Sequence, residues 1–286
     1  MNELDINNPQ LPDFIVPGAD EKKQDEPAKI KVIGVGGGGG NAVNHMYHQG
    51  IGGVSFVLCN TDAQALRNSP VPVKVQLGAK GEGAGNIPEV AKKLAEESAA
   101  EVEALFDDNT RMAFITAGMG GGTGTGAAPV VARIAKEKGV LTVGIVTIPF
   151  LFEGEPKILQ AFAGVEEMRK HVDALLVINN ERLCKIYPDL SWTTAFAKAD
   201  DSLSNAARSI AELVSKDGKI NLDFADVRTT LKDGGAAVIS TGSGEGEHRM
   251  SRAIQNALTS PLLKESDIYG AERVLFNLYF SPEEGE

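Results

Sequence analysis

The sequence has little of what marks secreted, disulfide-stabilised or membrane-spanning proteins. Its two cysteines, Cys59 and Cys184, lie far apart in apolar stretches, so we expect no disulfide framework and two reduced thiols, as in the cytoplasm. The longest apolar-rich run, 140–152, is shorter than the roughly 20 residues that a membrane-spanning helix needs. No basic segment followed by an apolar stretch opens the chain, so we expect neither a signal peptide nor insertion into a membrane.

Several common catalytic and metal-binding motifs are also missing. The chain has no GxxxxGK(S/T) phosphate loop, no HExxH and no GxSxG, which excludes ordinary P-loop NTPases, zincins and α/β-hydrolases. His45 and His48 share a predicted helical face, but no third ligand lies near them in the sequence, so no dedicated metal site is predicted.

Positive charge is in deficit. The chain has 28 Lys and Arg residues against 39 Asp and Glu residues, which gives a formal net charge of −11 at pH 7. An acidic protein repels a polyphosphate backbone, so we expect no nucleic-acid partner. The hydrophobic fraction of 42% is that of an ordinary globular protein, which excludes disorder of the whole chain.

Glycine is the residue in excess, with 32 of 286 positions. This is about 11% of the chain, against a usual value near 7%. The excess has no collagen-like period and is concentrated in two clumps, at 34–40 and 118–126, each with six glycines. The two clumps therefore need a local explanation.

Predicted strands and helices alternate after a charged, proline-rich arm at 1–28, which we expect to be disordered. This alternation predicts an α/β fold with a parallel sheet covered on both faces, in which ligands bind beyond the carboxyl ends of the strands. The third strand contains a proline, which favours an edge position. Strands are predicted at 30–35, 54–58, 71–77, 112–116, 140–148 and 174–178, and helices at 41–49, 88–105, 127–138 and 157–170.

The second part of the chain begins with a long amphipathic helix. Its apolar positions are spaced three or four apart over 199–215. A loop at 220–226 then leads into a short helix. Further along, a strand is predicted at 236–240, a helix at 247–258 and a strand at 274–280.

Both glycine clumps directly follow a predicted strand and open a predicted helix. Glycine lets a phosphate approach the backbone amides, and a helix N-terminus adds N–H donors and partial positive charge. The first clump satisfies GxGxxG, and Asp62 lies near the end of the second strand, so a dinucleotide fold with Asp62 on a ribose hydroxyl is one alternative. The second clump adds Thr123 and Thr125 to another such turn, and two turns on one sheet edge indicate a nucleoside triphosphate.

The sequence GGGTGTG at 120–126 resembles the signature of the tubulin/FtsZ family. Further matches come in the order of that family: the first glycine loop with Asn41, NTDAQAL at 60–66, FEG at 152–154 and NxDFADVR at 221–228. The resemblance implies a Rossmann-like GTPase domain with a parallel sheet, a central helix and a smaller, incomplete α/β C-terminal domain. The expected regions are the arm at 1–28, the GTP-binding domain at 29–198, the central helix at 199–220 and the C-terminal domain at 221–286.

The same resemblance implies GTP, later GDP, with Mg²⁺ as the ligands. Glu153 and Lys157 would lie near the ribose, although bacterial relatives usually carry Arg at the second position. Asn180, Phe196 and Asp200 would recognise guanine. The other nucleotide-binding residues would be Gly37, Gly38, Gly39, Gly40, Asn41, Asn60, Asp62, Ala84, Gly85, Gly120, Gly121, Gly122, Thr123, Gly124 and Thr125, with Ala84 and Gly85 beside the γ-phosphate.

Catalysis and assembly are linked in this family. The resemblance implies that Asp223 and Asp226 enter the nucleotide site of the next subunit and position the attacking water, helped by Asn221 and a cation such as K⁺. A head-to-tail contact does not close on itself and builds a filament. The expected partners are further copies of the chain and regulators of the division ring, in the cytoplasm at the division site of a bacterium.

Two alternatives and one departure from the family qualify these expectations. The alternatives are a related assembly protein that binds GTP without hydrolysing it, and an NAD-dependent oxidoreductase. The family normally continues through further strands, a linker and a tail that binds membrane-tethering partners, whereas this sequence stops at Glu286. Membrane tethering through a tail is therefore not expected of this chain.

Overall fold

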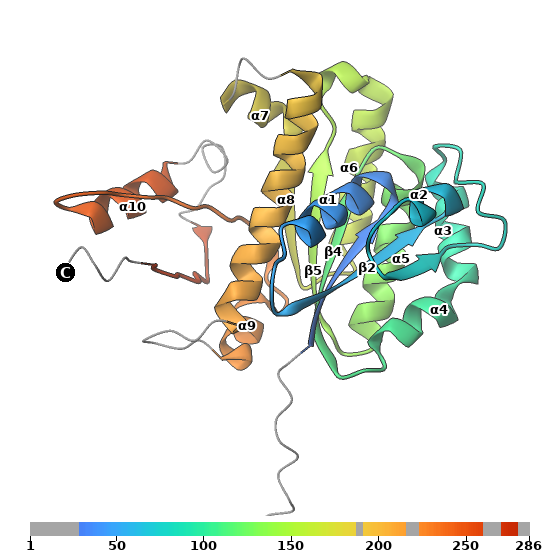
Figure 1. Ribbon diagram of the computed structural model, residues 1–286, viewed down its shortest axis with the longest axis horizontal. Helices are drawn as coiled ribbons and strands as arrows, with labels where there is room; N and C mark the ends of the chain where they lie inside the picture. Colours follow the sequence, from blue (N-terminus) through green and yellow to red (C-terminus); the bar gives the residue numbers. More distant parts are fainter. Residues whose placement is uncertain (1–28, 187–190, 216–222, 260–269, 280–286) are drawn as a thin grey trace, which may run out of the picture.

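The computed structural model describes residues 29–186, 191–215, 223–259 and 270–279. Its centre is a seven-stranded sheet with the order β3-β2-β1-β4-β5-β6-β7, in which all neighbours are parallel (Figure 1). The predicted α/β fold with a parallel sheet is confirmed. The strands are β1 (Lys29–Val35), β2 (Val54–Asn60), β3 (Val73–Gln76), β4 (Thr110–Gly118), β5 (Leu141–Ile148), β6 (Ala174–Asn179) and β7 (Gly235–Ala237).

Helices cover both faces of the sheet because alternate residues of the central strands are apolar on each side. In β1, Ile33 and Val35 point into one core and Ile30 and Val32 into the other. The first core lies under α3 (Pro88–Glu97), α4 (Ala99–Glu103), α5 (Gly122–Glu137) and α6 (Glu155–Arg169). The second lies under α1 (Gly36–His48), α2 (Ala63–Arg67), α8 (Trp192–Ser215) and α9 (Phe224–Leu231).

The remaining short elements are at the ends of the sheet or outside it. They are the 3₁₀ turns η1 (Ala104–Phe106) and η2 (Leu151–Glu153) and the helices α7 (Asn180–Ile186) and α10 (Arg249–Leu258). No helix in the described ranges has both the length and the apolar character needed to cross a membrane.

Several helices begin earlier than the sequence predicts. Helix α1 starts at Gly36 rather than at 41, and α5 at Gly122 rather than at 127, so much of each glycine clump is helical. Glycine has a low helix propensity, which is why the sequence pattern places these starts too late. Helix α8 also starts early, at Trp192 rather than at 199.

The predicted helix at 88–105 is interrupted. It divides at Ser98, whose Oγ accepts a hydrogen bond from the backbone N–H of Gly78 at 2.8 Å. The edge position predicted for the third strand is correct, since β3 is the outermost strand and begins directly after Pro72.

The C-terminal part of the chain departs further from the predictions. Strand β7 pairs with β6, with Ala174 opposite Gly235, so it extends the main sheet. The strand predicted at 274–280 is wrong over 274–279, where the structure has no strand. Leu275 packs against the second core, but the neighbouring apolar side chains are exposed, with Val274 at 79%. The arm at 1–28 lies outside the described residues, and the division into four regions stays a prediction.

Candidate functional site

Two helix N-termini meet at the carboxyl edge of the sheet. Helix α1 follows β1 and α5 follows β4, and these two strands are neighbours. The residues that precede the helices, Val35 and Gly121, cap neither helix with a side-chain hydrogen bond in the described structure. The first amides of both helices are therefore left without side-chain acceptors, and their dipoles make this edge favourable for an anion.

Glycine is required at some positions of the first clump and not at others. A Cβ atom at Gly39 would lie 2.2 Å from the carbonyl oxygen of Thr116, and one at Gly36 would lie 2.7 Å from the backbone N of Gly124. Gly36 also has a φ of +72°, which L side chains rarely adopt. At Gly37, by contrast, a Cβ would have no described atom within 4 Å. Gly36 thus lets α1 pack closely against α5 and Gly39 lets it pack closely against β4, whereas Gly37 faces open space.

A third glycine-rich segment joins the first two. A Cβ at Gly122 would lie 2.9 Å from the backbone N of Ile87, so the start of α5 packs against the loop that precedes α3. Gly85 and Asn86 in that loop have φ values of +58° and +62°. Neighbouring Ala84 is buried. The structure thus brings the predicted phosphate-binding residues of all three segments to one edge.

Two polar residues that sequence reasoning did not single out support the second glycine clump. Gln160 on α6 donates hydrogen bonds from Nε2 to the carbonyl oxygens of Gly120 and Gly121, both at 3.1 Å. Buried Thr61 shares a hydrogen bond of 2.7 Å with the hydroxyl of Thr123. These contacts cross between elements, so no local sequence pattern indicates them.

The hydroxyl of Thr125 is used inside its own loop. Its Oγ1 accepts a hydrogen bond of 2.9 Å from the backbone N–H of Gly120. The side chain is buried, so in this state it holds the loop in shape. The predicted contact of Thr125 with a nucleotide therefore stays a prediction.

Asn60 and Asp62 follow the carboxyl end of β2. Asp62 is the N-cap of α2, and its Oδ1 accepts hydrogen bonds from the backbone N–H groups of Gln64 at 2.8 Å and Ala65 at 3.3 Å. Asn60 accepts from the backbone N–H of Asp62 at 3.2 Å and lines a small pocket with Asn41 and neighbouring glycines of α1. Oδ1 of Asp62 is therefore used to cap α2, and the predicted contacts of Asn60 and Asp62 with a nucleotide stay predictions.

An aromatic ring and two polar side chains lie at the start of α7 and α8. Phe196 is 43% exposed and packs edge-on against buried Phe150, with ring centroids 5.2 Å apart, which leaves a ring surface open for stacking. Asn180 is 5% exposed, yet its Oδ1 has no hydrogen-bond donor among the described residues. A buried acceptor without a donor is uncommon in proteins and indicates a missing partner.

Asp200 is also an acceptor that is largely removed from water. Burial raises the pKa of its carboxyl from 3.8 to about 6, with His45 opposing the shift and Asp201 reinforcing it. An acid that is costly to ionise in the free protein becomes easier to ionise when N–H donors face it. Asn180 and Asp200 thus each provide an acceptor, and Phe196 provides an open ring, while their predicted contact with guanine stays a prediction.

Glu153 and Lys157 form an ion pair beside the second clump. The Lys157 Nζ lies 3.3 Å from Oε2 of Glu153, whose Oε1 accepts a hydrogen bond from the backbone N–H of Phe150 at 3.0 Å. A Cβ at Gly120 would lie 2.7 Å from the carbonyl oxygen of Lys157. The pair therefore lies between the aromatic cluster of Phe150, Phe152 and Phe196 and the glycine-rich edge.

The two predicted catalytic acids are at the N-terminus of α9. Asp223 is its N-cap and Asp226 is in its first turn, so the loop expected at 220–226 is wrong for Asp226. Asp223 Oδ1 accepts from the N–H of Asp226 at 2.9 Å, and Asp226 Oδ2 accepts from the N–H of Asp223 at 3.2 Å. Both side chains are exposed, and Asn221 lies outside the described residues.

These acids lie far from the glycine-rich segments of the same chain. Phe224, next to Asp223, lies under the guanidinium of Arg111, 5.1 Å from its ring centroid. Arg111 is at the amino end of β4, whereas Gly120 follows its carboxyl end. Helix α8, with 24 residues and a length of about 36 Å, runs from the aromatic cluster towards α9 (Figure 1). The structure therefore places the predicted acids and the predicted phosphate site at opposite edges of the sheet.

Comparison with known proteins identifies the family. The model of the tubulin/FtsZ family GTPase domain matches residues 29–188, and that of the FtsZ family C-terminal domain matches residues 235–283. This chain belongs to the tubulin/FtsZ family. Membership in this family leaves the NAD-dependent oxidoreductase alternative without support.

Individual members of the tubulin/FtsZ family are similar over most of this chain. The cell division protein FtsZ of Porphyromonas gingivalis is 65% identical over 262 residues, which is 90% of this chain and 57% of that protein. FtsZ of Aquifex aeolicus is 48% identical over 259 residues, 89% of this chain and 70% of that protein. This chain thus spans little more than half the length of the first relative.

Solved structures show the same fold. An empty FtsZ dimer from M. jannaschii is 45% identical with a TM-score of 0.79, over 84% of this chain and 71% of that one. A GTPγS-bound protofilament of CetZ2 from Haloferax volcanii is 25% identical with a TM-score of 0.67, over 77% of this chain and 67% of that one.

Proposed function

We propose that this chain binds GTP at the glycine-rich edge and hydrolyses it to GDP and phosphate in a site that a second copy completes. One observation carries the proposal: the two exposed acids of α9 lie at the amino edge of the sheet, and the glycine-rich segments lie at the carboxyl edge. One chain cannot bring these groups together, but two chains stacked edge to edge can.

The glycine-rich edge suits a triphosphate. The amides at the starts of α1 and α5 would hold phosphate oxygens, Gly37 leaves space for them, and the loop at 84–86 would close over the terminal phosphate. Mg²⁺ would arrive with the nucleotide and neutralise part of its charge, with the hydroxyl of Thr123 close by.

The aromatic cluster suits guanine. Phe196 offers a ring on which the base stacks, and Asn180 Oδ1 and the Asp200 carboxylate offer acceptors for the N1–H and amino groups of guanine. A base of this kind supplies the donor that Asn180 lacks in the free protein. Glu153 and Lys157 lie where the ribose would connect the two ends.

Hydrolysis depends on the α9 of the neighbouring copy. Asp223 and Asp226 each use one carboxylate oxygen in the reciprocal cap and keep the other available. These free oxygens would orient a water for in-line attack on the γ-phosphate and accept its proton, with Asn221 and a cation such as K⁺ assisting. Turnover would then follow assembly, and loss of the γ-phosphate would weaken the contact.

The contact is head-to-tail, so it generates a filament. The dimer and protofilament named for the related structures support such assembly. By family we assign this chain a role in bacterial cell division, in the cytoplasm at the division site, with division-ring regulators as further partners.

The test is GTP turnover per subunit as a function of protein concentration, for the wild type and for Asp223→Ala. We expect turnover to rise cooperatively in the wild type and to vanish in the variant while GTP binding persists. Turnover that does not depend on concentration would overturn the shared site. GTP binding with no turnover at any concentration would instead support the non-hydrolysing alternative.

A further inference from the structure

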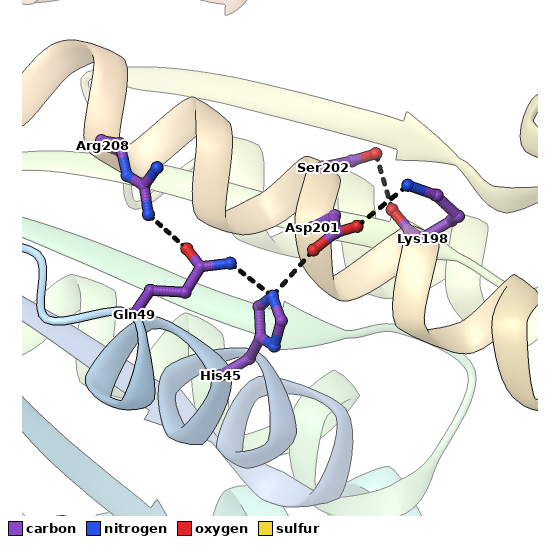
Figure 2. Close-up of polar contacts among 6 residues, drawn as sticks. All are labelled: His45, Gln49, Lys198, Asp201, Ser202 and Arg208. Atoms are coloured by element: carbon purple, nitrogen blue, oxygen red, sulfur yellow. Dashed lines mark hydrogen bonds and ion pairs between the residues drawn. The ribbon is translucent and has the colours of Figure 1, made fainter.

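A polar network joins α1 to α8 (Figure 2). His45 Nε2 lies 2.7 Å from Asp201 Oδ1 and 2.6 Å from Gln49 Nε2. Arg208 donates to Oε1 of Gln49, and the Lys198 Nζ lies 3.3 Å from Oδ2 of Asp201. Three of these residues lie on α8 and two on or directly after α1.

The network connects the two ends of the nucleotide site. His45 lies one helical turn after Asn41, on the helix that begins with the phosphate-binding glycines. Asp201 follows Asp200 and lies five residues after Phe196, on the helix that carries the base-binding groups. The contacts His45–Asp201 and Gln49–Arg208 follow each other in the same order along both helices, so α1 and α8 run in the same direction (Figure 2).

The position of the pair argues against a role in stability alone. The side chains of His45 and Asp201 are 36% and 33% exposed, and ion pairs that exposed contribute little to folding. The pair does, however, fix the distance between two helices that would each hold one end of the same ligand.

Gln49 and Asp201 both contact Nε2 of His45, but one requires an acceptor there and the other requires a donor. Arg208 can only donate, so the Gln49 atom that it contacts is the oxygen, and the amide nitrogen of Gln49 is left to donate to His45. An ionised Asp201 can only accept. When Nε2 carries a hydrogen, it donates to Asp201 and links the two helices. When Nε2 carries none, it accepts from Gln49, and Asp201 keeps its contact with Lys198.

We propose that His45 and Asp201 are a positioning pair that holds the base-binding start of α8 against the phosphate-binding helix α1. The proposal rests on the proposed nucleotide function. A ligand that bridges both helices benefits from the link because their relative position is already set. A ligand that contacts only the phosphate segments gains nothing from it.

The test compares a bridging ligand with one that reaches a single helix. Affinities for GDP and for inorganic pyrophosphate, both with Mg²⁺, are measured for the wild type, His45→Ala, Asp201→Ala and the double variant. His48→Ala is the matched control, because His48 is an exposed histidine on the same helix outside this network. Thermal unfolding of each variant reports whether the fold is retained.

We expect His45→Ala and Asp201→Ala each to weaken GDP binding about 5-fold, at the low end of site-to-site coupling because the pair is partly exposed. The double variant should lose no more than either single one, as for residues that act together. Pyrophosphate affinity and the control should not change. Equal weakening of GDP and pyrophosphate would overturn the proposal, because the pair would then merely support α1.

The outcomes separate the two proposals. If the wild type binds GDP and the variants bind it equally well, the positioning pair is overturned and the proposed function stays intact. Wild type that binds no guanine nucleotide overturns the proposed function and the positioning pair with it.

Discussion

The same substitution at two nearby glycines should have opposite effects on stability. In Gly39→Ala the new Cβ would lie 2.2 Å from the carbonyl oxygen of Thr116 and 3.2 Å from the Cα of Ala117. Both are backbone atoms of the central strand β4 and cannot rotate away. Overpacking of this kind costs about 3 kcal/mol, and more where the backbone must shift. We therefore expect Gly39→Ala to lower the Tm by about 6 °C or more.

Gly37→Ala should leave the fold intact and damage the site. Its Cβ meets no described atom within 4 Å, and alanine is favoured over glycine in a helix by up to about 1 kcal/mol. The expected Tm is equal to that of the wild type or up to about 4 °C higher. The methyl group enters the space assigned to phosphate, so GTP affinity should fall at least about tenfold.

Thermal unfolding without nucleotide and titration with GTP measure the two effects on the same samples. The reasoning is refuted if Gly37→Ala loses as much stability as Gly39→Ala, or if it binds GTP as tightly as the wild type. The first result would mean that Gly37 is a packing glycine, and the second that the phosphates lie elsewhere.

Three further predictions concern the base, the ribose and α9. Burial raises the pKa of Asp200 from 3.8 to about 6, so between these pH values the folded free protein retains a proton that the unfolded chain loses. The free energy of unfolding should therefore fall as the pH rises from about 4 to about 6. Guanine needs the ionised form, so GTP affinity should fall as the pH drops below about 6, and Asp200→Asn should reduce this dependence in binding titrations. Lys157→Arg should tighten nucleotide binding a few-fold in the same titrations, because a guanidinium can contact Glu153 and a ribose oxygen together; weaker binding would contradict the ribose assignment. Arg273 donates to the carbonyl oxygens of Thr229, Thr230 and Lys232 at the end of α9, at 3.0, 3.4 and 2.8 Å, and Arg273→Ala removes these donors. Assembly-dependent turnover should then fall, while GTP binding by the isolated subunit stays unchanged. A loss of GTP binding would disprove the separation of the two edges.

The sequence alone predicts the sheet well because its central strands are buried on both faces. Runs such as 112–116 and 140–148 are apolar except for threonines, with no charged residue, and the structure has strands at both. Helix starts are harder to predict where tertiary packing overrides local propensity. Gly36 and Gly122 begin helices because their bare backbones pack closely against neighbouring segments, which no local pattern reveals.

The same limit applies to the second half of the chain. The apolar and aromatic run at 274–280, with Asn277 as its one polar residue, is typical of a strand, but a strand also needs a neighbour to pair with, and 274–279 pairs with none of the described strands. Such a pattern shows that a segment can form a strand, but it does not show whether another strand lies beside it to pair with.

Some residues of the candidate site can be predicted from the sequence pattern, and others cannot. The glycine clumps predict a phosphate site from the residues alone, and the structure gathers them at one edge. Phe196 and Asp200 were indicated only by resemblance, because a lone aromatic and a lone acid on a helix carry no specific pattern. Gln160 and Arg111 were missed because each acts through a contact between distant elements.

The central claim is that one copy supplies the nucleotide site and the next copy supplies the acids. Mixing two inactive variants tests it most directly. Asp223→Ala combined with Asp226→Ala removes the acids and keeps the glycine-rich edge, whereas Gly37→Val blocks the phosphate space and keeps the acids. Each should hydrolyse no GTP alone, and an equal mixture should recover up to about a quarter of wild-type turnover, since one contact in four joins an intact nucleotide site to intact acids. A mixture as inactive as its components, although both variants are folded and the first still binds GTP, would contradict the shared site.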